Sequence, residues 1–232
     1  MNQNLLGLSS MATRPILTAL CDHIGREHGI PVRFDAAGGV ETARRVRDGA
    51  QADLLVLAEE AANSLEREGH LLAGSVRPLF VSRVVAAVRD ASPVPVLDTE
   101  SDLRSVLLSA SRIAYSTGPS GTAITDLIAR FGLTDVLADR LVQAPPGVPV
   151  GDVLSSGRAD LGFQQQSELM DLPGVVVVGA LPGDTAIEST FCGGVLTCTG
   201  QEERARDVLG ILGSEAAAAT VRARGMRTHG HA

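Results

Sequence analysis

The sequence predicts an α/β protein of two lobes that two long strands connect. Short apolar runs alternate with amphipathic helical patterns from the start of the chain, which is typical of βαβ units and a parallel sheet. Residues 79–89 and 187–198 are long and β-rich, and we interpret them as strands that leave the first lobe and return to it. The lobes are therefore expected at 1–81 with 193–232 and at 82–192, since 232 residues suffice for two small domains.

The first lobe begins with a buried strand, a turn of hydroxyl residues and a helix. The apolar run that starts at Leu5 breaks at Ser9 and Ser10, and a helical pattern follows that ends near Gly29. One of the two serines is expected to cap this helix, whose remaining free amides then lie above the turn. Strands are expected at 31–36 and 53–58, and helices at 40–49, 59–69, 202–212 and 215–224.

The second lobe continues the alternation of strands and helices. Its first helix follows a loop that carries Pro93 and Pro95. Apolar runs of three to six residues again fit strands, and the segments between them show helical spacing. Helices are expected at 102–110, 122–132, 151–158 and 167–170, and strands at 112–116, 141–144, 160–164 and 175–181.

Composition excludes several classes of function. Aromatic residues make up 3% of the chain and the net charge is −7, so neither a base-stacking nucleic-acid surface nor binding to an anionic membrane is expected. No stretch reaches the roughly 18 apolar residues of a membrane span. Three cysteines and five histidines show no metal-ligand spacing, so no metal is expected. The N-terminus lacks the pattern of a secretion signal, so we expect a cytoplasmic protein, or a periplasmic or lipid-anchored one if the chain is trimmed.

Small and hydroxyl residues precede the helices at four turns that would face a cleft between the lobes. Such turns leave backbone amides available to hold an anion without Lys or Arg. Ligands of folds of this kind sit where the carboxyl ends of strands meet. The four turns are Ser9 with Ser10, Gly38 with Gly39, residues 116–121 and residues 148–151.

These residues and others resemble the molybdate-type periplasmic solute-binding proteins over nearly the whole chain. None of the matching segments is specific to this family alone, but the order and spacing of the segments along the chain are specific to it. The segments that carry the resemblance are Leu8-Ser9-Ser10-Met11, Gly38-Gly39, Ala43-Arg44-Arg45, residues 49–53, Arg112-Ile113-Ala114, residues 148–151, residues 157–162 and Arg224-Gly225-Met226.

The resemblance implies a type II periplasmic-binding-protein fold with a two-strand hinge and an interlobe cleft. It also implies anion-binding residues at Ser10, Gly39, Val150, Gln165 and the turn of residues 116–121. In that turn the expected contacts are Ser116, Thr117, Ser120 and Gly121. Position in the predicted fold adds Ser9, Arg14, Gly38 and Gln164 as candidates for substrate binding.

Two departures from the family pattern argue against molybdate as the ligand. Gly39 stands where the family has a second serine, and Gln165 stands where it has a tyrosine, so we expect at most weak molybdate binding. Without these hydroxyl groups the site is roomier, and glutamines with Thr117 suit the carboxylates and hydroxyls of an organic acid. The expected ligand is a small polycarboxylate.

Three functions follow from this interpretation. The chain resembles the aconitate isomerase-like branch of the family, which implies a cytoplasmic enzyme that shifts a proton along an unsaturated acid. That chemistry needs a base and oxyanion donors but no cofactor, and Glu168 and Ser116 are the candidate catalytic residues. The alternatives are a solute-binding protein of a molybdate-type or organic-anion transporter, with a permease as partner if it is exported, and a cytoplasmic ligand sensor.

Overall fold

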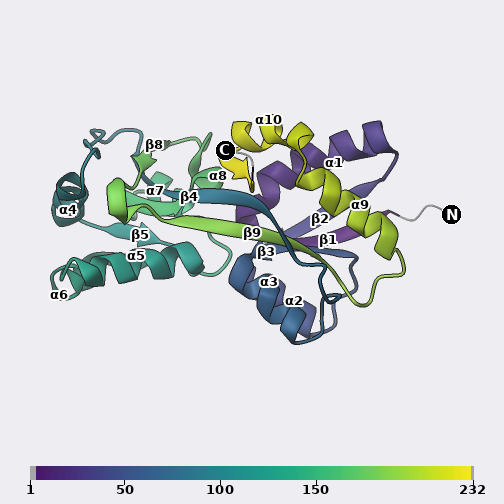
Figure 1. The fold of residues 1–232 in the computed structure, drawn as a ribbon. Coiled ribbons are helices and arrows are strands. Elements are labelled where there is room, and N and C mark those ends of the chain that lie inside the picture. The colour runs from purple at the N-terminus through teal and green to yellow at the C-terminus, as the bar shows by residue number, and fades with distance from the viewer. Residues whose placement is uncertain (1–3, 231–232) are drawn as a thin grey trace. The chain divides into compact units, whose positions relative to one another are not determined.

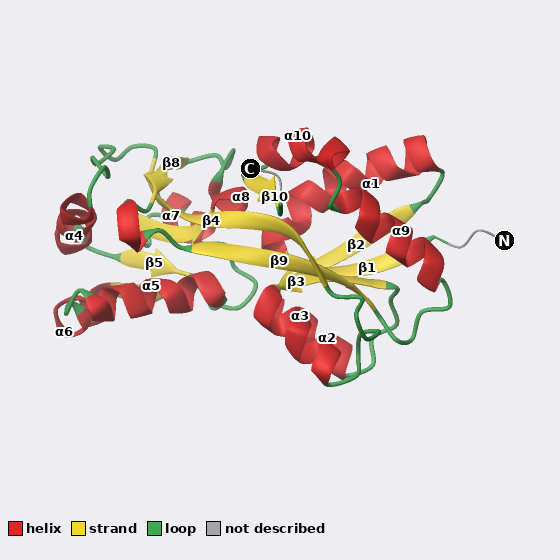
Figure 2. Cartoon of the chain, viewed as in Figure 1, coloured by secondary structure: helices red, strands yellow, loops and turns green. Residues whose placement is uncertain are grey.

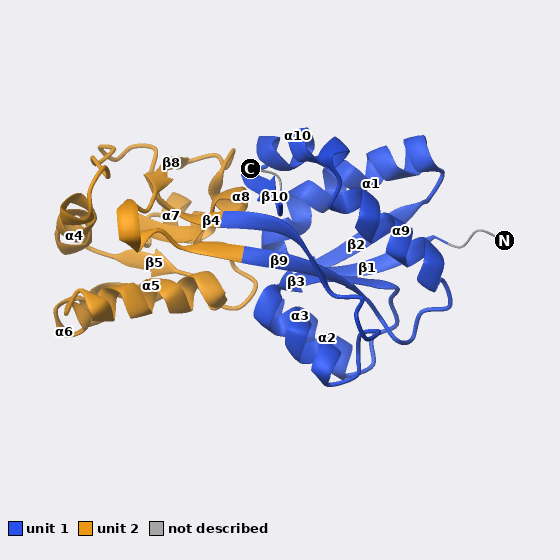
Figure 3. Cartoon of the chain, in the orientation of Figure 1, with its two compact units in different colours: residues 1–82, 190–232 blue, residues 83–189 orange. Residues whose placement is uncertain are grey.

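The computed structural model describes residues 4–230, which form two compact units. Unit 1 takes the chain up to Ser82 and again from Thr190, and unit 2 runs from Arg83 to Ser189 (Figure 3). Strand β4 (Arg77–Arg89) carries the chain from unit 1 into unit 2, and β9 (Glu188–Val195) carries it back. The sequence predicts lobe boundaries at 81/82 and 192/193, whereas the compact units divide at 82/83 and 189/190. The predicted lobe boundaries remain a prediction.

The strands of unit 1 begin as the predicted βαβαβ unit. β1 pairs in parallel with both β2 and β3, and β9 runs antiparallel to β3. The first part of β4 pairs in antiparallel register with β10, where Met226 lies opposite Ser82. The strand bounds are β1 (Leu5–Ser10), β2 (Val32–Ala37), β3 (Leu54–Ala58) and β10 (Met226–Thr228).

Two helical layers cover the sheet of unit 1 (Figure 1). Successive residues of β3 face opposite sides, because side chains alternate along a strand. Leu54 and Val56 join one core cluster with α1, α9 and α10, and Leu55 and Leu57 join another with α2 and α3. The helices are α1 (Arg14–His28), α2 (Gly39–Arg47), α3 (Glu59–Arg67), α9 (Glu202–Leu212) and α10 (Glu215–Ala223).

Unit 2 has a mixed sheet in the order β8, β4, β7, β5, β6. The second part of β4 is antiparallel to β7 and β8, and β5 is parallel to β6 and β7. Phe163 of β7 faces one core cluster, whereas Gly162 contacts Val150 and Leu154 on the other side. The remaining strands are β5 (Ile113–Tyr115), β6 (Leu141–Gln143), β7 (Leu161–Gln165) and β8 (Val175–Ala180).

The helices of unit 2 lie on both faces of its sheet. Helices α4, α5 and α6 supply buried leucines and isoleucines to the cluster around Phe163, and α7 and α8 pack on the opposite cluster. Figure 2 shows the helices and strands alternating along the chain, as the predicted α/β class requires. The helices are α4 (Glu100–Ser109), α5 (Pro119–Arg130), α6 (Thr134–Leu137), α7 (Val150–Ser155) and α8 (Gln166–Leu169).

Three local features differ from the sequence prediction. β1 extends through both serines, and a 3₁₀ turn at Met11–Thr13 separates it from α1. The predicted serine cap is wrong, because Thr13 occupies the cap position of α1 and the Ser10 side chain bonds no helix amide. The single-turn helix α6 and the three-residue strand β10 were not predicted, since elements this short carry no periodic signal.

Candidate functional site

The first predicted turn places Ser10 in a small hydroxyl cluster. The Ser10 and Thr13 hydroxyl oxygens lie 3.3 Å apart, and the Thr13 hydroxyl also donates to the Ser10 carbonyl oxygen at 3.1 Å. A hydroxyl carries one proton, so when Thr13 gives its proton to the carbonyl, the proton of Ser10 points to Thr13. A ligand anion can take that proton by rotation of the Ser10 hydroxyl alone.

The second predicted turn presents backbone rather than side chains. Gly38 caps α2, and Gly39 is the first residue of that helix, whose first amides have no partner within the helix. A Cβ atom at either glycine would meet nothing within 4 Å, so both stand in open space. The Thr42 hydroxyl donates to the Ser9 carbonyl oxygen at 3.0 Å and fixes α2 against β1. This turn can hold an anion through amides.

The third predicted turn contains a pair of serines in unit 2. The hydroxyl oxygens of Ser116 and Ser120 lie 2.9 Å apart, and the Gly118 amide donates to the Ser116 oxygen at 3.3 Å. Two hydroxyls carry two protons and their mutual bond uses one, so the other remains for a ligand. Ser120 is buried, Ser116 is half-buried and Thr117 is exposed, so Ser116 and Thr117 are the more accessible hydroxyl residues of this turn.

Gly121 is essential to this turn for a steric reason. A Cβ atom there would lie 1.8 Å from the Ser116 carbonyl oxygen and 2.8 Å from its carbon. The start of α5 therefore packs directly on the backbone of Ser116. This contact fixes the serine pair against the helix.

Gln164 connects the fourth predicted turn to Glu168. The side-chain oxygen of Gln164 accepts from the Val150 amide at 2.8 Å, and its side-chain nitrogen donates to a Glu168 carboxylate oxygen, also at 2.8 Å. Both ends of the buried Gln164 amide are thus used within unit 2. The Val150 amide thus donates to Gln164, and Gln164 in turn orients Glu168. The predicted roles of Val150 and Gln164 in ligand binding stay predictions.

Glu168 is a half-buried carboxyl group with no cation beside it among the described residues. Burial raises its pKa from 4.5 to about 7, and the hydrogen bond from Gln164 opposes that rise. Desolvation of the charged form outweighs one hydrogen bond to it. At neutral pH both the acid and the base form are therefore populated.

Gln165 lies on the other face of β7 from Gln164. Its side-chain nitrogen donates to the Ser189 hydroxyl at 2.8 Å, and its side-chain oxygen is buried without a hydrogen-bond partner among the described residues. Reversing the amide would let the oxygen accept from Ser189 and leave the nitrogen unpartnered. In either orientation one polar atom of this amide remains for another group.

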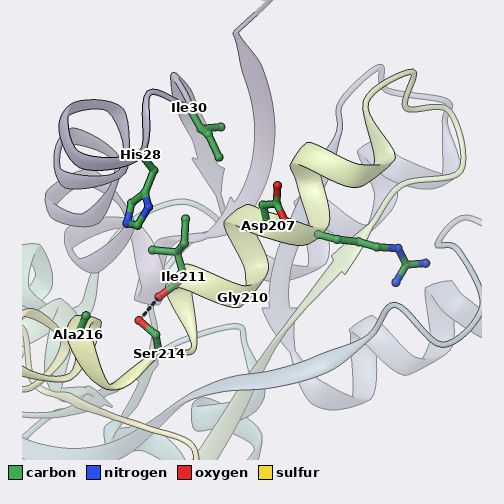
Figure 4. A pocket seen from close by; sticks show the side chains of 8 residues that line it. His28, Ile30, Asp207, Gly210, Ile211, Ser214 and Ala216 are labelled. Carbon is green, nitrogen blue, oxygen red and sulfur yellow. Dashed lines mark hydrogen bonds between the residues drawn. The ribbon is translucent and has the colours of Figure 1, made fainter.

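The remaining predicted residues of unit 1, Ser9 and Arg14, lie at a pocket beside helix α1. Ser9 is fully buried, and it lines a pocket of about 240 Å³ between α1 and β2 together with Arg14. A second pocket of unit 1, of about 530 Å³, contains none of the predicted residues (Figure 4). That pocket lies beside His28 and Ile211, and the Ser214 hydroxyl donates to the Ile211 carbonyl oxygen there at 2.7 Å.

The structure thus groups the unit 2 candidates into three sets: the serine pair, the Gln164–Glu168 set and Gln165. The sequence prediction missed Thr13, Thr42 and Ser189 as partners. Thr13 was detectable as a hydroxyl three residues after Ser10, whereas nothing in the sequence connects Ser189 to Gln165. The described residues contain no cluster of three or more His, Cys, Asp or Glu suited to a metal ion. Nor does any helix in residues 4–230 have the length and apolarity needed to cross a bilayer.

Comparison with known proteins identifies the family of the chain. The model of the bacterial extracellular solute-binding protein family matches residues 5–227. The aconitate isomerase of a Pseudomonas species is 29% identical over 176 residues, which cover 76% of this chain and 67% of the relative. The molybdate-binding protein ModA of Azotobacter vinelandii is 27% identical over 144 residues, which cover 61% of this chain and 56% of that relative.

Solved structures confirm the fold. The periplasmic molybdate-binding protein of Azotobacter vinelandii superposes with a TM-score of 0.81 at 21% identity, covering 96% of this chain and 98% of that one. The sulfate-binding protein SubI of Mycobacterium tuberculosis gives a TM-score of 0.80 at 17% identity, with 98% and 88% covered. The predicted type II periplasmic-binding-protein fold and the resemblance to molybdate-binding proteins are therefore confirmed. The ligand cleft between the lobes stays a prediction.

Proposed function

Because the chain belongs to the family of bacterial extracellular solute-binding proteins, we propose that it binds a small polycarboxylate. We further propose that it shifts a proton along this ligand, as an isomerase of unsaturated acids. The first part follows the anion-binding relatives of the chain, among them a molybdate-binding protein and an aconitate isomerase. The second part rests on the side chains of unit 2.

The observation that carries the enzymatic proposal is the setting of Glu168. Its carboxylate receives a hydrogen bond from Gln164 at 2.8 Å, and no basic side chain neutralises it among the described residues. A group that transfers protons works best when its pKa lies near the working pH, and burial raises the pKa of Glu168 to about 7. Strongly shifted pKa values gather at functional sites, which favours a role for Glu168 in proton transfer.

In the proposed reaction the ionised Glu168 removes a proton from a carbon atom beside a ligand carboxylate. The electron pair moves through the neighbouring double bond, and the negative charge spreads over the carboxylate oxygens. Glu168 then returns the proton to the far carbon of the allylic system, so the double bond changes place and no atom is gained or lost. No redox partner is required.

The hydroxyl groups of unit 2 suit the charge that develops in this step. Ser116 keeps a proton for a ligand oxygen because Ser120 and Gly118 satisfy its other interactions. Thr117 beside it is exposed, and one polar atom of Gln165 is unpartnered. Donors held in place before the reaction stabilise a developing oxyanion more than the ground state. The turn of Ser10 and Gly39 in unit 1 is a further predicted anchor.

Proton NMR in heavy water tests the proposal directly. We expect the purified chain to interconvert cis- and trans-aconitate or to exchange their allylic protons for deuterium. Glu168→Gln should abolish the exchange, and Glu100→Gln, which neutralises an exposed carboxylate of the same unit, should leave it intact. Exchange that persists in Glu168→Gln would exclude Glu168 as the base. A well-folded wild-type chain that exchanges no proton of these acids would exclude the isomerase.

The alternative is a binding protein that delivers an organic anion or molybdate to a transporter. The family and the solved relatives that bind molybdate or sulfate favour it. Tight binding of a polycarboxylate without proton exchange would support this alternative. Sub-micromolar molybdate binding would also support it and would contradict the expected effect of Gly39 and Gln165. The compartment stays a prediction, and cell fractionation tests it, because the enzyme is proposed for the cytoplasm and a transporter component must be exported.

A further inference from the structure

Gln165 and Ser189 form a polar pair at one edge of the sheet of unit 2, and we call them the Gln165–Ser189 pair. Gln165 is the last residue of β7, and Ser189 is the last residue of unit 2, near the start of β9. The side-chain nitrogen of Gln165 donates to the Ser189 hydroxyl oxygen at 2.8 Å. This hydrogen bond sets the direction of the Gln165 side chain.

The neighbouring glutamine shows an amide whose two ends are both used. Gln164 accepts from the Val150 amide and donates to Glu168, so its oxygen and its nitrogen each have a partner in the chain. The Gln165 side chain has one partner, although the residue is 4% exposed, because its oxygen bonds nothing among the described residues. A buried polar atom without a partner is unfavourable, so this atom calls for a group that the chain itself does not supply.

The register of the sheet places this amide at the same edge as the turn of residues 116–121. β5 runs parallel to β7 with Tyr115 opposite Phe163, so the two strands end at the same edge. Phe163 packs with Ile124 of α5 in one core cluster, and Gln165, two residues further along β7, points to the same face. The unpartnered amide atom therefore lies on the face of the sheet that α5 covers, near the turn that leads into that helix.

The Gln165–Ser189 pair carries no charge. Glu188, which precedes Ser189 on β9, faces the opposite side of the strand and accepts from Arg83 at 3.1 Å. Among the described residues no charged side chain bonds Gln165 or Ser189. A ligand carboxylate placed against this pair would lose its hydration without meeting a cation, which is costly, whereas a neutral polar group loses far less.

A hydroxyl is the neutral ligand group that fits the pair best. The Gln165 amide can present its oxygen, as it does in the structure, or its nitrogen if the side chain reverses. Ser189 stays bonded in both orientations, because a hydroxyl accepts from the nitrogen or donates to the oxygen. A ligand hydroxyl also donates and accepts, so it satisfies either end of the amide, whereas a carboxylate only accepts.

We propose that the Gln165–Ser189 pair recognises a hydroxyl group of the ligand. Gln165 contacts that hydroxyl, and Ser189 is the positioning residue that holds Gln165. The ligand class is then the hydroxy polycarboxylates. This inference rests on the proposed function, since it concerns the same polycarboxylate site. A hydroxy acid differs from the corresponding unsaturated acid by one molecule of water, so it competes with the substrate of the proposed isomerase.

Calorimetric titration of the whole chain with matched acids tests the proposal. Citrate and tricarballylate differ by one hydroxyl group, and so do malate and succinate. We expect the hydroxy acid of at least one of these two sets to bind roughly tenfold tighter or more, because a site that hydrogen-bonds a hydroxyl discriminates against the acid that lacks it. Gln165→Leu should remove this preference.

Ser189→Ala tests the positioning role. It should lower the preference for the hydroxy acid several-fold, because Gln165 loses the hydrogen bond that directs it, and Ser189→Thr, which keeps the hydroxyl, should restore the preference. Ser101→Ala removes an exposed serine hydroxyl of the same unit and is the control. A merely structural role of Ser189 would change the affinities for both acids of a set alike and leave their ratio as it is in the wild type.

Equal binding of the hydroxy acid and its counterpart in both sets would overturn the inference and leave the proposed function standing, because polycarboxylates would still bind. A preference that persists in Gln165→Leu, or an unchanged ratio in Ser189→Ala, would also overturn it. If none of the four acids binds, the proposed ligand class fails together with the inference. Proton exchange on aconitate is a separate measurement, so a failure of the isomerase is distinguishable from a failure of the hydroxyl preference.

Discussion

The two units place a glycine in the first turn of a helix, at Gly39 of unit 1 and at Gly121 of unit 2, for opposite reasons. Nothing lies within 4 Å of a Cβ atom built at Gly39, whereas one built at Gly121 would lie 1.8 Å from a backbone oxygen. The glycine of unit 1 leaves room above a helix end, and the glycine of unit 2 allows a helix to touch a turn. The same residue type thus marks open space in one unit and close packing in the other.

The polar groups of the two units also differ, because unit 1 offers backbone donors around Gly39, whereas the polar side chains of unit 2 pack against one another. Around Gly39 the available donors are backbone amides and the single hydroxyl of Ser10. In unit 2 the polar side chains bind one another, as in the Ser116–Ser120 pair and the Gln164–Glu168 pair. In the proposed function, unit 1 holds the anion through backbone amides and one hydroxyl, whereas unit 2 supplies the side chains for proton transfer.

The strongest test of this contrast is the same substitution in both units. Gly121→Ala should lower the free energy of unfolding by at least about 3 kcal/mol, because the methyl group would overlap the Ser116 backbone. Gly39→Ala should change it by less than about 1 kcal/mol, and in the stabilising direction, because alanine fits the helix and restricts the unfolded chain. Urea denaturation measures both. Equal effects would show that the two glycines have the same role.

Glu168→Gln should stabilise the chain at alkaline pH. The folded pKa of about 7 exceeds the ordinary 4.5, so the stability contributed by protonated Glu168 is complete below pH 4.5 and is lost as pH rises through 7. Above that pH the buried charge costs about 3 kcal/mol, which the neutral amide avoids. Denaturation at pH 8 should show this gain and denaturation at pH 4.5 almost none. A variant that is less stable than the wild type at pH 8 would contradict the raised pKa.

Ser120→Ala tests whether the serine pair acts as a unit. Ser120 is buried and holds the Ser116 hydroxyl at 2.9 Å, so its loss should leave the proton of Ser116 poorly directed. Turnover or ligand affinity should fall on the order of tenfold, as for one misplaced oxyanion donor. Ser109→Ala removes an exposed hydroxyl of the same unit and is the control. Equal activities of the two variants would assign Ser120 to packing alone.

The smallest expected effect concerns molybdate and the open space at Gly39. Gly39→Ser should strengthen molybdate binding by a few-fold, because it restores a hydroxyl donor where a side chain meets no obstacle. Gly38→Ser is the control, since a serine at that position caps α2 and directs its oxygen to the helix amides. Thermal-shift titration compares the three chains. A larger gain from Gly38→Ser would place the ligand differently from the prediction.

The sequence predicts those elements of the fold that leave a local pattern of apolar and helix-starting residues. Residues 54–57 are buried and β3 pairs in parallel with β1 as predicted, because a short continuous apolar run fits a strand covered on both faces. Helix α5 begins at Pro119, three residues before the predicted start, although proline is a known first helical residue. The serines of β1 show the opposite error, since their hydroxyls suggested a cap where the chain is still extended.

The candidate site was less predictable because its contacts depend on the folded chain. The sequence predicts glutamines at the carboxyl end of a strand, and Gln164 and Gln165 are the last two residues of β7, yet they face opposite sides and have different partners. Because side chains alternate along a strand, the sequence predicts that Gln164 and Gln165 face opposite sides of β7, but it does not predict which residues they contact. Ser189 reaches Gln165 from 24 residues away, a contact that no local pattern encodes. The burial of Glu168 likewise depends on how α8 packs.

The most direct test of the account is the titration of Glu168 itself. Carbon-13 NMR of the chain labelled at the glutamate carboxyl groups can follow it, with Glu168→Gln to assign its signal. We expect an apparent pKa of about 7 for Glu168, because burial raises the pKa and the hydrogen bond from Gln164 opposes part of that rise. Gln164→Leu, which removes that hydrogen bond, should raise the value further. A Glu168 pKa near the ordinary 4.5 in the wild type would contradict the claim that unit 2 holds a carboxylate ready for proton transfer.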